Sequence, residues 1–446
     1  MISMKKVLLI SLAFPPIPHV GGLRITKFCK FLPESGWAPV VLTQNVKEFY
    51  EGQDWTSMKD VPEHVKIIRT SNFQPFYWWD NRFKERNGQT RSAVRSDQRE
   101  VTSSSRPAYL KDAAGLLRKV LTVPDDRLAW IPQAILPGIK HIYKEHIDII
   151  LSSSPSPTNH ILGYLLSIIC SRPHVVDFRD LWTLNEAYQF RNLPDFLKAY
   201  DKFWEKIILK HAAKMIVVNN TLKDQLITEN PDICDGKVEV IYNGFDVDDC
   251  PADFLKNKKN DKFTIVYAGN IYGHRSPAFF FQSLAKWIRR QEHLAKSVRI
   301  DFLGGGYSET LDNTLKGIVE FHPRVRKDLA LRAIFNSDLL LLIHGFDTLT
   351  ASSTSTKLFE YLATGKPILA IMPPGEAADI LNSSGNENLV VSSPDEEKVI
   401  TFLNRQYDKW CKSETVNHNL SNTPAKFSRK YQSQQLAFLL NSLAVK

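Results

Sequence analysis

Short apolar runs rich in leucine and β-branched residues alternate along this chain with amphipathic stretches that have the period of a helix. In the first half of the sequence these runs fall at residues 7–10, 40–43, 65–68, 147–151, 175–178, 215–218 and 238–241. A second series follows the lysine-rich segment 256–262, at residues 264–268, 298–303, 318–321, 339–343, 368–371 and 389–391. The alternation predicts an α/β fold in which βαβ units build mostly parallel sheets.

The length of the chain, 446 residues, exceeds what one ordinary hydrophobic core supports. The two series of strands therefore predict two doubly wound, Rossmann-like domains, at residues 1–250 and 260–424, with a hinge near 246–262. Apolar residues recur near helical spacing in the segment 425–446. We expect this segment to form one helix that packs back toward the first domain.

One segment departs from the alternation. From residue 80 to residue 106, arginines and lysines are interspersed with Ser, Thr, Asn and Gln, and apolar residues are almost absent after Phe83. We interpret residues 80–110 as a mobile basic insertion in the first domain. Aromatic residues cluster just before it, between Phe73 and Trp79. They either pack in the core or form, with the arginines, a patch that touches anionic lipid headgroups.

The chain carries 57 Lys and Arg against 48 Asp and Glu, a net charge of +9. This excess suits nucleic acid, an anionic membrane surface or phosphorylated small molecules. The sequence shows no helix-turn-helix spacing, zinc finger or RNP-type aromatic strand, so nucleic acid is not expected as a partner. The five cysteines show no CxxC spacing, which argues against a disulfide framework or a zinc site and predicts a reducing, cytoplasmic location.

No apolar run in the sequence is long enough to cross a bilayer, so a transmembrane protein is not expected. The apolar segment near the N-terminus is short and ends in Pro15 and Pro16 instead of a small-residue cleavage site. We therefore interpret it as a first strand and not as a signal peptide.

Residues 356–370 predict a short helix that runs into a Gly-Lys-Pro turn and an apolar strand. Lys357 and Glu360 lie three residues apart and share one face of that helix. Its first turn, Thr356 to Leu358, offers free backbone N–H groups to an anion, and the Ser/Thr run before it offers capping hydroxyls. The segment is either an ordinary corner with a solvated ion pair or a binding site for a nucleoside diphosphate.

Other candidate residues of the first domain follow predicted strands, where doubly wound sheets bind their ligands. Gly21 and Gly22, at the first strand-to-helix turn, either let a ligand approach the backbone or form a tight corner. Arg179 and Asp180 follow a buried strand. They either pair with each other or serve a site, because buried charges are costly unless they are compensated.

In the second domain, Arg275 stands just ahead of a helix predicted to begin at residue 278, where a guanidinium can hold a phosphate through two hydrogen bonds. A run of three glycines, 304–306, ends the next strand, and residues 325–329 open a later helix. We expect all these turns at one edge of the sheets, so that the positive charges converge on one cleft between the domains.

The motifs FPP…GG…R, DFRDLWT, AGN…R, FLGGG, HPRVRKDL and KLFEYLATGKPILAI, in this order, resemble the retaining GT-B glycosyltransferases of family four over nearly the whole chain. The resemblance implies two Rossmann-like domains that face each other across a cleft, with the donor nucleotide against the second domain. It implies transfer of a sugar, with retention of configuration, from a UDP- or GDP-linked donor to a hydroxyl of a glycan or lipid-linked acceptor. Such enzymes make cell-surface polysaccharides or glycoconjugates.

The resemblance also implies roles for residues that match the family motifs. Glu360 matches the glutamate that holds the ribose hydroxyls of the donor. Arg275 and Asn270 match the positions that hold the diphosphate, with the paired glycines of the first turn beside it. The backbone at Val325 falls where the family contacts the base.

The chain departs from the family pattern at several positions, which leaves the donor sugar undefined. Ser352 stands where the first of two family glutamates is expected, so the usual carboxylate contact to the donor sugar is missing. Arg179 replaces a histidine that approaches the donor sugar, Arg275 replaces a lysine, and Asn270 replaces an arginine. Lys357 makes up the positive charge at the diphosphate.

The mechanism implied for such an enzyme requires cations and helix N-termini that stabilise the departing diphosphate, and domain closure that excludes water. We expect Arg275 and Lys357 to act on the diphosphate, and Arg179 with Asp180 to shape the sugar or acceptor site. No metal and no other cofactor is expected. A peripheral position on the inner face of the membrane is a further expectation, because the aromatic cluster and the arginines fit an anionic surface.

Two alternatives remain. A GT-B nucleotide-sugar epimerase would need no acceptor and would carry additional acid/base carboxylates, of which the sequence shows no clear set. A non-catalytic GT-B protein that binds a membrane or nucleic acid is favoured by Ser352 and by the basic insertion.

Overall fold

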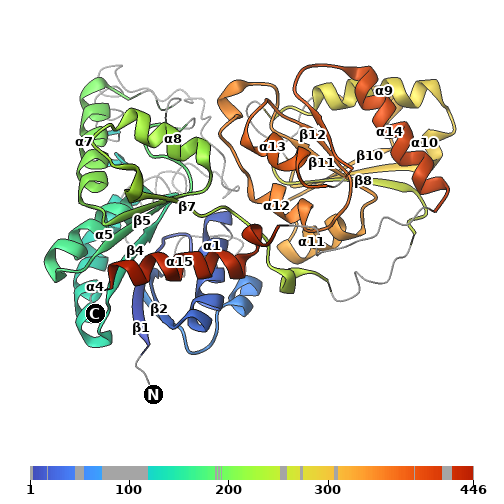
Figure 1. Cartoon of the computed structure of the whole chain (residues 1–446). Coiled ribbons are helices and arrows are strands. Elements are labelled where there is room, and N and C mark those ends of the chain that lie inside the picture. Colours follow the sequence, from blue (N-terminus) through green and yellow to red (C-terminus); the bar gives the residue numbers. More distant parts are fainter. Residues whose placement is uncertain are drawn as a thin grey trace, which may run out of the picture. The chain divides into compact units, whose positions relative to one another are not determined.

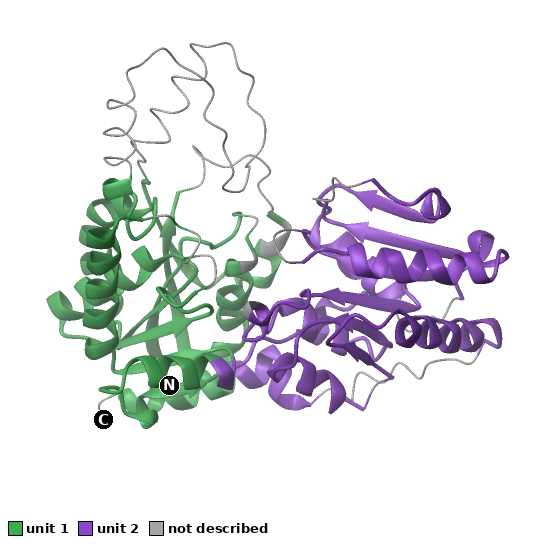
Figure 2. Cartoon of the chain, turned by 90° about the horizontal axis from the view of Figure 1, so that it is seen from above, with its two compact units in different colours: residues 1–218, 222–241, 433–446 green, residues 219–221, 242–432 purple. Residues whose placement is uncertain are grey.

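The computed structural model describes residues 4–17, 19–45, 55–72, 119–185, 188, 191, 193–251, 259–271, 275–305, 310–385, 387–413 and 424–444. These residues form two compact units, which Figure 2 distinguishes by colour. Unit 1 lies within residues 1–218, 222–241 and 433–446, and unit 2 consists of residues 219–221 and 242–432.

Unit 1 contains a parallel sheet with the strand order β3-β2-β1-β4-β5-β6-β7 (Figure 1). The strands are β1 (Lys5–Ile10), β2 (Trp37–Gln44), β3 (Lys66–Thr70), β4 (Ile149–Ser153), β5 (His174–Phe178), β6 (Lys214–Val217) and β7 (Val238–Val240). The order reverses between β1 and β4, which makes this point the switch point of a doubly wound sheet.

Helices cover both faces of the unit 1 sheet. They are α1 (Val20–Phe31), α4 (Ile131–Glu145), α5 (Pro157–Cys170), α7 (Asp195–His211), α8 (Asn220–Glu229) and α15 (Arg429–Leu443). Because successive side chains of a strand point to opposite faces, Val7 and Leu9 pack in the core formed with α1 and α15, whereas Leu8 and Ile10 pack in the core formed with α4 and α5. The first residues of α8 and of α15 belong to unit 2.

Unit 2 repeats the arrangement with the order β10-β9-β8-β11-β12-β13, also parallel. Its strands are β8 (Phe263–Ala268), β9 (Val298–Leu303), β10 (Val319–His322), β11 (Leu339–Ile343), β12 (Ile368–Ile371) and β13 (Leu389–Val391). Its helices are α9 (Ala278–Arg290), α10 (Leu294–Ser297), α11 (Lys327–Asn336), α12 (Thr356–Leu362), α13 (Glu376–Asn382) and α14 (Glu396–Cys411). Side chains of α9 and α14 share one core with the sheet, and side chains of α11, α12 and α13 share the core on its other face.

All the predicted strands are confirmed to within three residues at either end, but two helix boundaries were predicted wrongly. The first helix begins at Val20, so the paired glycines lie in its first turn and not before it. The C-terminal helix begins at Arg429 and not at residue 425. Ala425–Phe427 form a short 3-10 helix, and Ser428 is extended and bridged to Phe245. Phe245 N–H donates to Phe427 O at 3.0 Å and Arg429 N–H donates to Phe245 O at 2.8 Å.

The aromatic cluster between Phe73 and Trp79 and the basic insertion at residues 80–110 lie outside the described residues. Within the described part of the chain, none of the helices combines the length and the apolar character that crossing a bilayer requires.

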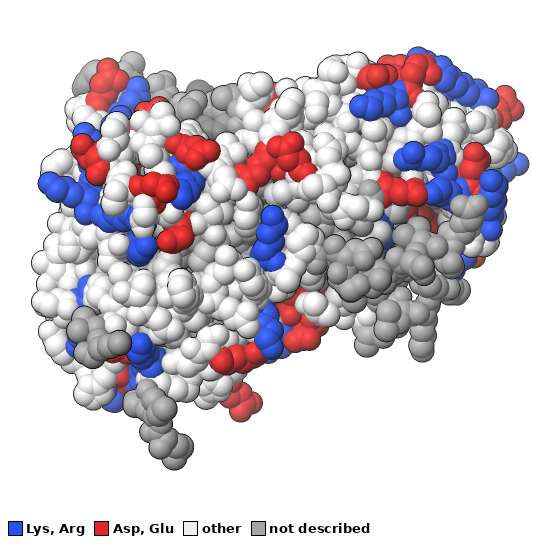
Figure 3. Space-filling model, in the orientation of Figure 1, with Lys and Arg blue, Asp and Glu red and all other residues white. Residues whose placement is uncertain are grey.

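Charges of both signs are interspersed over α9 and α14 on the visible face of unit 2 (Figure 3). Lys286 of α9 pairs with Glu396 at 3.1 Å and with Glu397 at 2.8 Å, and Arg290 pairs with Glu397 at 2.6 Å. The net positive charge of the chain is therefore not concentrated into a patch of one sign on this surface.

Candidate functional site

The carboxyl ends of β8 and β11 flank the switch point of the unit 2 sheet, the place where a doubly wound sheet binds its ligand. The segment after β8 contains Gly269, Asn270 and Arg275. The segment after β11 contains His344 and leads into α12, which carries Lys357. Groups from both sides of the switch point can therefore contribute to one site.

Gly269 follows β8 with a φ of +134°, a conformation that favours glycine. Its N–H donates to Leu303 O at 2.6 Å, which ties the segment after β8 to the end of β9. A Cβ atom on Gly269 would collide with the amine and Cε of Lys357. The glycine therefore leaves the space through which the Lys357 side chain passes at the end of β8.

The Lys357 amine is held by an aromatic ring. It lies 4.6 Å from the ring centroid of Tyr267 and donates to the Tyr267 hydroxyl at 3.3 Å. That hydroxyl in turn donates to the carbonyl of Asn270 at 3.1 Å. An ammonium over the face of a ring is attracted by its quadrupole, so Lys357 is fixed at the sheet edge although it belongs to a helix.

Positive groups are crowded around this amine. Burial and the charge of Arg275 lower the pKa of Lys357 to about 7, against the opposing effect of Glu360. Burial also lowers the pKa of His344 to about 3, and Arg275 and Lys357 add to that effect, so the His344 imidazole is neutral near pH 7. A bound anion would favour the charged form of Lys357, so this edge of the sheet is a candidate anion site.

Glu360 lies one turn after Lys357 on α12 and is half-buried. Burial raises its pKa, and the nearby Lys327 opposes this; Lys327 itself pairs with Asp249 at 2.8 Å. No described residue forms a hydrogen bond or ion pair with the Glu360 carboxylate. Its acceptor capacity is therefore available to the hydroxyl groups of a ligand.

The prediction that the Ser/Thr run caps α12 was wrong. Ser355 is the N-cap residue, but its side chain makes no capping hydrogen bond, and its hydroxyl lies 3.3 Å from His344 Nε2. A residue distant in the sequence holds the run instead. The Asn219 amide donates to Ser352 O at 2.8 Å and to Thr354 Oγ1 at 2.9 Å. Serine and threonine oxygens here stabilise a loop and not a helix end.

The remaining predicted residues of unit 2 lie near the same sheet edge. Leu358 is fully buried in the core and Thr356 nearly so, and the Leu358 N–H already donates to Ser355 O at 3.1 Å. Val325 packs against the same core just before α11. Asn270 is exposed directly after Gly269.

In unit 1, Gly21 and Gly22 lie in the first turn of α1, where the helix packs closely against the segment after β1. His19 Nδ1 accepts a hydrogen bond from Gly21 N–H at 2.8 Å and so caps α1. A Cβ atom on Gly22 would collide with the carbonyl oxygen of Ala13. Close packing alone therefore explains glycine at position 22, and contact of Gly21 or Gly22 with a donor stays a proposal.

Arg179 and Asp180 follow β5 without pairing to each other; no ion pair joins them in the described structure. The Arg179 N–H donates to Ser154 Oγ at 2.8 Å, which links the ends of β4 and β5. Burial lowers the pKa of Arg179 even though Asp180 and Asp177 oppose this. Its Nε is buried and has no hydrogen-bond partner, whereas Asp180 is exposed. An unsatisfied guanidinium N–H at a strand end fits a ligand acceptor group.

The sequence did not reveal the buried pair formed by Arg24 and Asp177. Both side chains are fully buried, with Arg24 Nε donating to Asp177 Oδ2 at 3.1 Å and Arg24 Nη2 lying 3.1 Å from Oδ1. Ser153 Oγ donates to the same carboxylate at 2.7 Å, and Arg24 Nη2 donates to Ile241 O at 3.0 Å. The sequence did contain a signal that each residue needs a partner. Arg24 is the only arginine of α1 and Asp177 is the only charged residue in the apolar run 175–178, and a buried charge must be compensated.

The loop that carries Arg179 is anchored on α7. Trp182 Nε1 donates to Asp201 Oδ1 at 2.8 Å, and Thr183 N–H donates to Glu205 Oε1 at 3.1 Å. Burial raises the pKa of both carboxyl groups. Two buried acids of α7 thus fix the backbone that follows Arg179.

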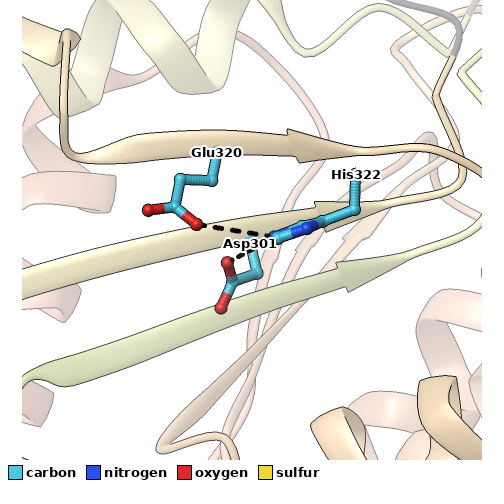
Figure 4. A group of neighbouring side chains, drawn as sticks. All are labelled: Asp301, Glu320 and His322. Carbon is cyan, nitrogen blue, oxygen red and sulfur yellow. Dashed lines mark hydrogen bonds and ion pairs between the residues drawn. The ribbon is translucent and has the colours of Figure 1, made fainter.

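A second cluster of titratable groups lies on β9 and β10, where Asp301, Glu320 and His322 point toward one another (Figure 4). His322 Nε2 lies 2.8 Å from Asp301 Oδ1 and 3.7 Å from Glu320 Oε2. Oxygen and imidazole ligands of this kind suit a divalent ion. Arg299, however, already pairs with Asp301 at 3.0 Å and with Glu320 at 3.1 Å. The arginine supplies the counter-charge, so we assign the cluster as a charged network at the sheet edge.

Residues 90–249 match the protein family described as Glycosyltransferase Family 4. The matched segment is less than half of the 446 residues, and it includes Arg179 and Asp180. No curated protein matches the chain.

Solved structures resemble the chain over nearly its whole length. Sucrose-phosphate synthase from Thermosynechococcus elongatus has a TM-score of 0.61 at 14% identity, covering 98% of this chain and 99% of that chain. Anabaena HepE in complex with UDP and glucose has a TM-score of 0.61 at 16% identity, covering 98% and 100%. UDP-GlcNAc 2-epimerase from Methanocaldococcus jannaschii has a TM-score of 0.52 at 11% identity, covering 98% and 99%. These similarities confirm the predicted GT-B fold of two Rossmann-like domains.

Proposed function

We propose that this protein is a glycosyltransferase that moves a sugar from a nucleoside diphosphate to a hydroxyl of a glycan or lipid-linked acceptor. The product configuration is retained, and the product belongs to a cell-surface polysaccharide or glycoconjugate. The match of residues 90–249 and the GT-B fold support the class of reaction. The observation that carries the proposal is the meeting of Lys357 and Arg275 at the switch point of unit 2, with Glu360 one turn further along α12.

In this proposal the desolvated cations act on the leaving group. Lys357 and Arg275 bind the diphosphate and stabilise the negative charge that grows on it as the bond to the sugar breaks. Because these side chains supply the charge, the reaction needs no metal. Glu360, whose acceptor capacity is unused in the protein, holds the two ribose hydroxyls. HepE was solved with UDP, which supports a uridine donor, and a guanosine donor is the alternative.

The other proposed contacts belong to the base, the sugar and the acceptor. We assign the backbone near Val325 to the base, and Asn270 with the first turn of α12 to the diphosphate. In unit 1, Arg179 and Asp180 bind the donor sugar or the acceptor, and the unsatisfied Arg179 Nε supports this role.

Binding of a nucleotide sugar tests the proposal directly. Calorimetry with a panel of UDP- and GDP-sugars is expected to show one donor that binds the wild-type protein in the presence of EDTA. The Glu360→Gln variant is expected to bind it at least about tenfold more weakly, because a charged acceptor of the ribose hydroxyls is lost. The exposed Glu292→Gln serves as the matched control.

The alternatives give different outcomes in the same experiments. An epimerase would convert the donor without any acceptor, which proton NMR of the sugar detects. If no nucleotide sugar binds, the protein is a non-catalytic member of the fold and the proposal fails.

The pKa of Lys357 predicts a pH dependence of donor binding. With a pKa of about 7 in the free protein, the amine loses its charge as the pH rises above 7. A bound diphosphate favours the charged form, so binding takes up a proton and affinity is expected to fall by up to about tenfold per pH unit above 7. Calorimetry of a UDP-sugar between pH 6 and pH 8.5 measures this slope. A flat profile in the wild-type protein would contradict the placement of Lys357 at the diphosphate, and Lys357→Met is expected to flatten it.

A further inference from the structure

Helix α7 of unit 1 exposes three aromatic side chains. Phe196, Tyr200 and Phe203 have exposed fractions of 57%, 42% and 56%. Their spacing of four and three residues places them in one stripe along the helix. The opposite side of α7, with Ile208 and Leu209, is buried in the core. The aromatic stripe therefore takes no part in packing the core.

Lysines form a second stripe beside the aromatic one. All of them are exposed and recur every four residues: Lys198, Lys202, Lys206 and Lys210. The acids in the middle of α7, Asp201 and Glu205, are buried and bonded to Trp182 and Thr183, so they do not lie on this side. Asp195 pairs with Lys198 at 3.0 Å, and the ammonium groups of the other three lysines form no ion pair within the described residues. We call the two stripes together the α7 face.

Apolar exposure continues on the neighbouring helices. Helix α5 packs against α7 through Tyr164 and Trp204, whose ring centroids are 6.3 Å apart, and it exposes Ile168 and Ile169. Figure 1 shows α4, α5 and α7 side by side in one layer of unit 1. Beyond α5, α4 exposes Leu136, with an exposed fraction of 71%. The neighbouring helices of the layer thus also expose apolar side chains.

We propose that the α7 face docks on a membrane surface that contains anionic lipid. The aromatic side chains enter the headgroup region, where a ring with one polar edge is well accommodated. The lysines extend their aliphatic stems along the same surface and place their ammonium groups at the lipid phosphates. The positive charge of Lys202, Lys206 and Lys210, which form no ion pair within the described residues, matches an anionic surface and gives the face its charge complementarity.

The composition of the face favours lipid over the other anionic partners. Protein interfaces are enriched in arginine and depleted in lysine, whereas α7 carries four exposed lysines and no arginine. Nucleic acid offers nothing that would cover the exposed isoleucines of α5 or Leu136 of α4. This proposal does not depend on the glycosyltransferase activity, and it rests on residues other than the aromatic cluster at residues 73–79.

Co-sedimentation with vesicles tests the docking, without nucleotide sugar or acceptor. The wild-type protein is expected to bind vesicles of phosphatidylcholine and phosphatidylglycerol more tightly than vesicles of phosphatidylcholine alone. Replacing Lys202, Lys206 and Lys210 by Gln is expected to weaken binding about fivefold per lysine and to reduce its salt dependence. The variant Phe196→Ser/Phe203→Ser is expected to lose at least about tenfold in binding while it keeps the salt dependence.

Matched controls come from exposed residues elsewhere. Phe438→Ser on α15, where the exposed fraction is 80%, and the combined variant Lys296→Gln/Lys316→Gln/Lys398→Gln in unit 2 are expected to bind as the wild type does. Equal thermal melting of all variants shows that the fold is kept.

Two results would overturn the docking proposal. One is equal wild-type binding to vesicles with and without phosphatidylglycerol. The other is wild-type binding by either α7 variant. Binding of a structured RNA that both α7 variants lose, without vesicle binding, would assign the face to nucleic acid instead. Sugar transfer to a soluble acceptor is expected to be unchanged in these variants, so failure of the docking proposal leaves the proposed activity untouched.

Discussion

Replacing Lys357 by Met is expected to remove most sugar transfer and, at the same time, to stabilise the fold. The leaving diphosphate loses a preorganised cation, which is expected to lower kcat/KM by about 10²–10³-fold. The gain in stability arises because the Lys357 amine is a buried cation. Burial and the nearby charge of Arg275 hold the pKa of Lys357 at about 7 in the folded protein, against an ordinary value of 10.5. The folded state therefore binds this proton more weakly than the unfolded chain does.

The sign of the stability change depends on pH in a defined way. Below pH 7 the folded protein carries the full penalty of the buried ammonium, and the penalty disappears as the pH rises from 7 toward 10.5. The gain in the melting temperature of Lys357→Met is thus expected to be largest at or below pH 7 and to shrink at higher pH. Thermal melting at several pH values, together with turnover of the same samples, measures both effects.

The matched control for this experiment is Lys316→Met, which changes an exposed lysine of unit 2. It is expected to leave both turnover and melting unchanged. A Lys357→Met protein that melts lower than the wild type and keeps its turnover would show that the lysine serves the fold and not the reaction.

Replacing Asp177 by Ala is expected to lower the free energy of unfolding by about 3–5 kcal/mol, one of the largest losses that a single substitution gives in this chain. The reason is that Arg24 remains as a buried cation without its carboxylate, at a site where both side chains are fully buried. Urea unfolding of unit 1, followed by the fluorescence of its buried tryptophans Trp37 and Trp130, measures the loss.

A double variant separates the cost of the unpaired charge from the value of the pair. Arg24→Met combined with Asp177→Leu is expected to recover most of the lost stability, because apolar groups of similar volume replace a desolvated ion pair at little net cost. If the double variant is as unstable as Asp177→Ala, the hydrogen bonds from Ser153 and to Ile241 carry the stability instead of the charge balance.

The strands and their doubly wound order could be predicted because each depends on a local signal. A buried parallel strand reads as a continuous apolar run, as at residues 339–343 and 368–371, and the structure places β11 and β12 there. Turns between strand and helix then fall at predictable places, which is why Arg275 and Lys357 could be named as candidates before their positions were known.

Contacts between distant segments could not be predicted in the same way. The amine of Lys357 lies over the ring of Tyr267, 90 residues earlier, and Arg24 pairs with Asp177 across 153 residues. A buried charge shows locally that it needs a partner, but no local pattern identifies the partner in either pair. The capping of α12 failed as a prediction for a related reason, because His344 lies against the hydroxyl of the N-cap residue Ser355, and the distant Asn219 holds other oxygen atoms of the Ser/Thr run.

The position of α15 has a consequence for how the protein is made. Leu436 and Leu440 of this helix share one core with Val7 and Leu9 of the first strand. During synthesis, β1 leaves the ribosome hundreds of residues ahead of α15, and unit 2 is translated in between. The part of the sheet face that α15 covers must therefore stay exposed until translation has passed residue 440, which leaves apolar surface open to aggregation or to chaperones in that interval.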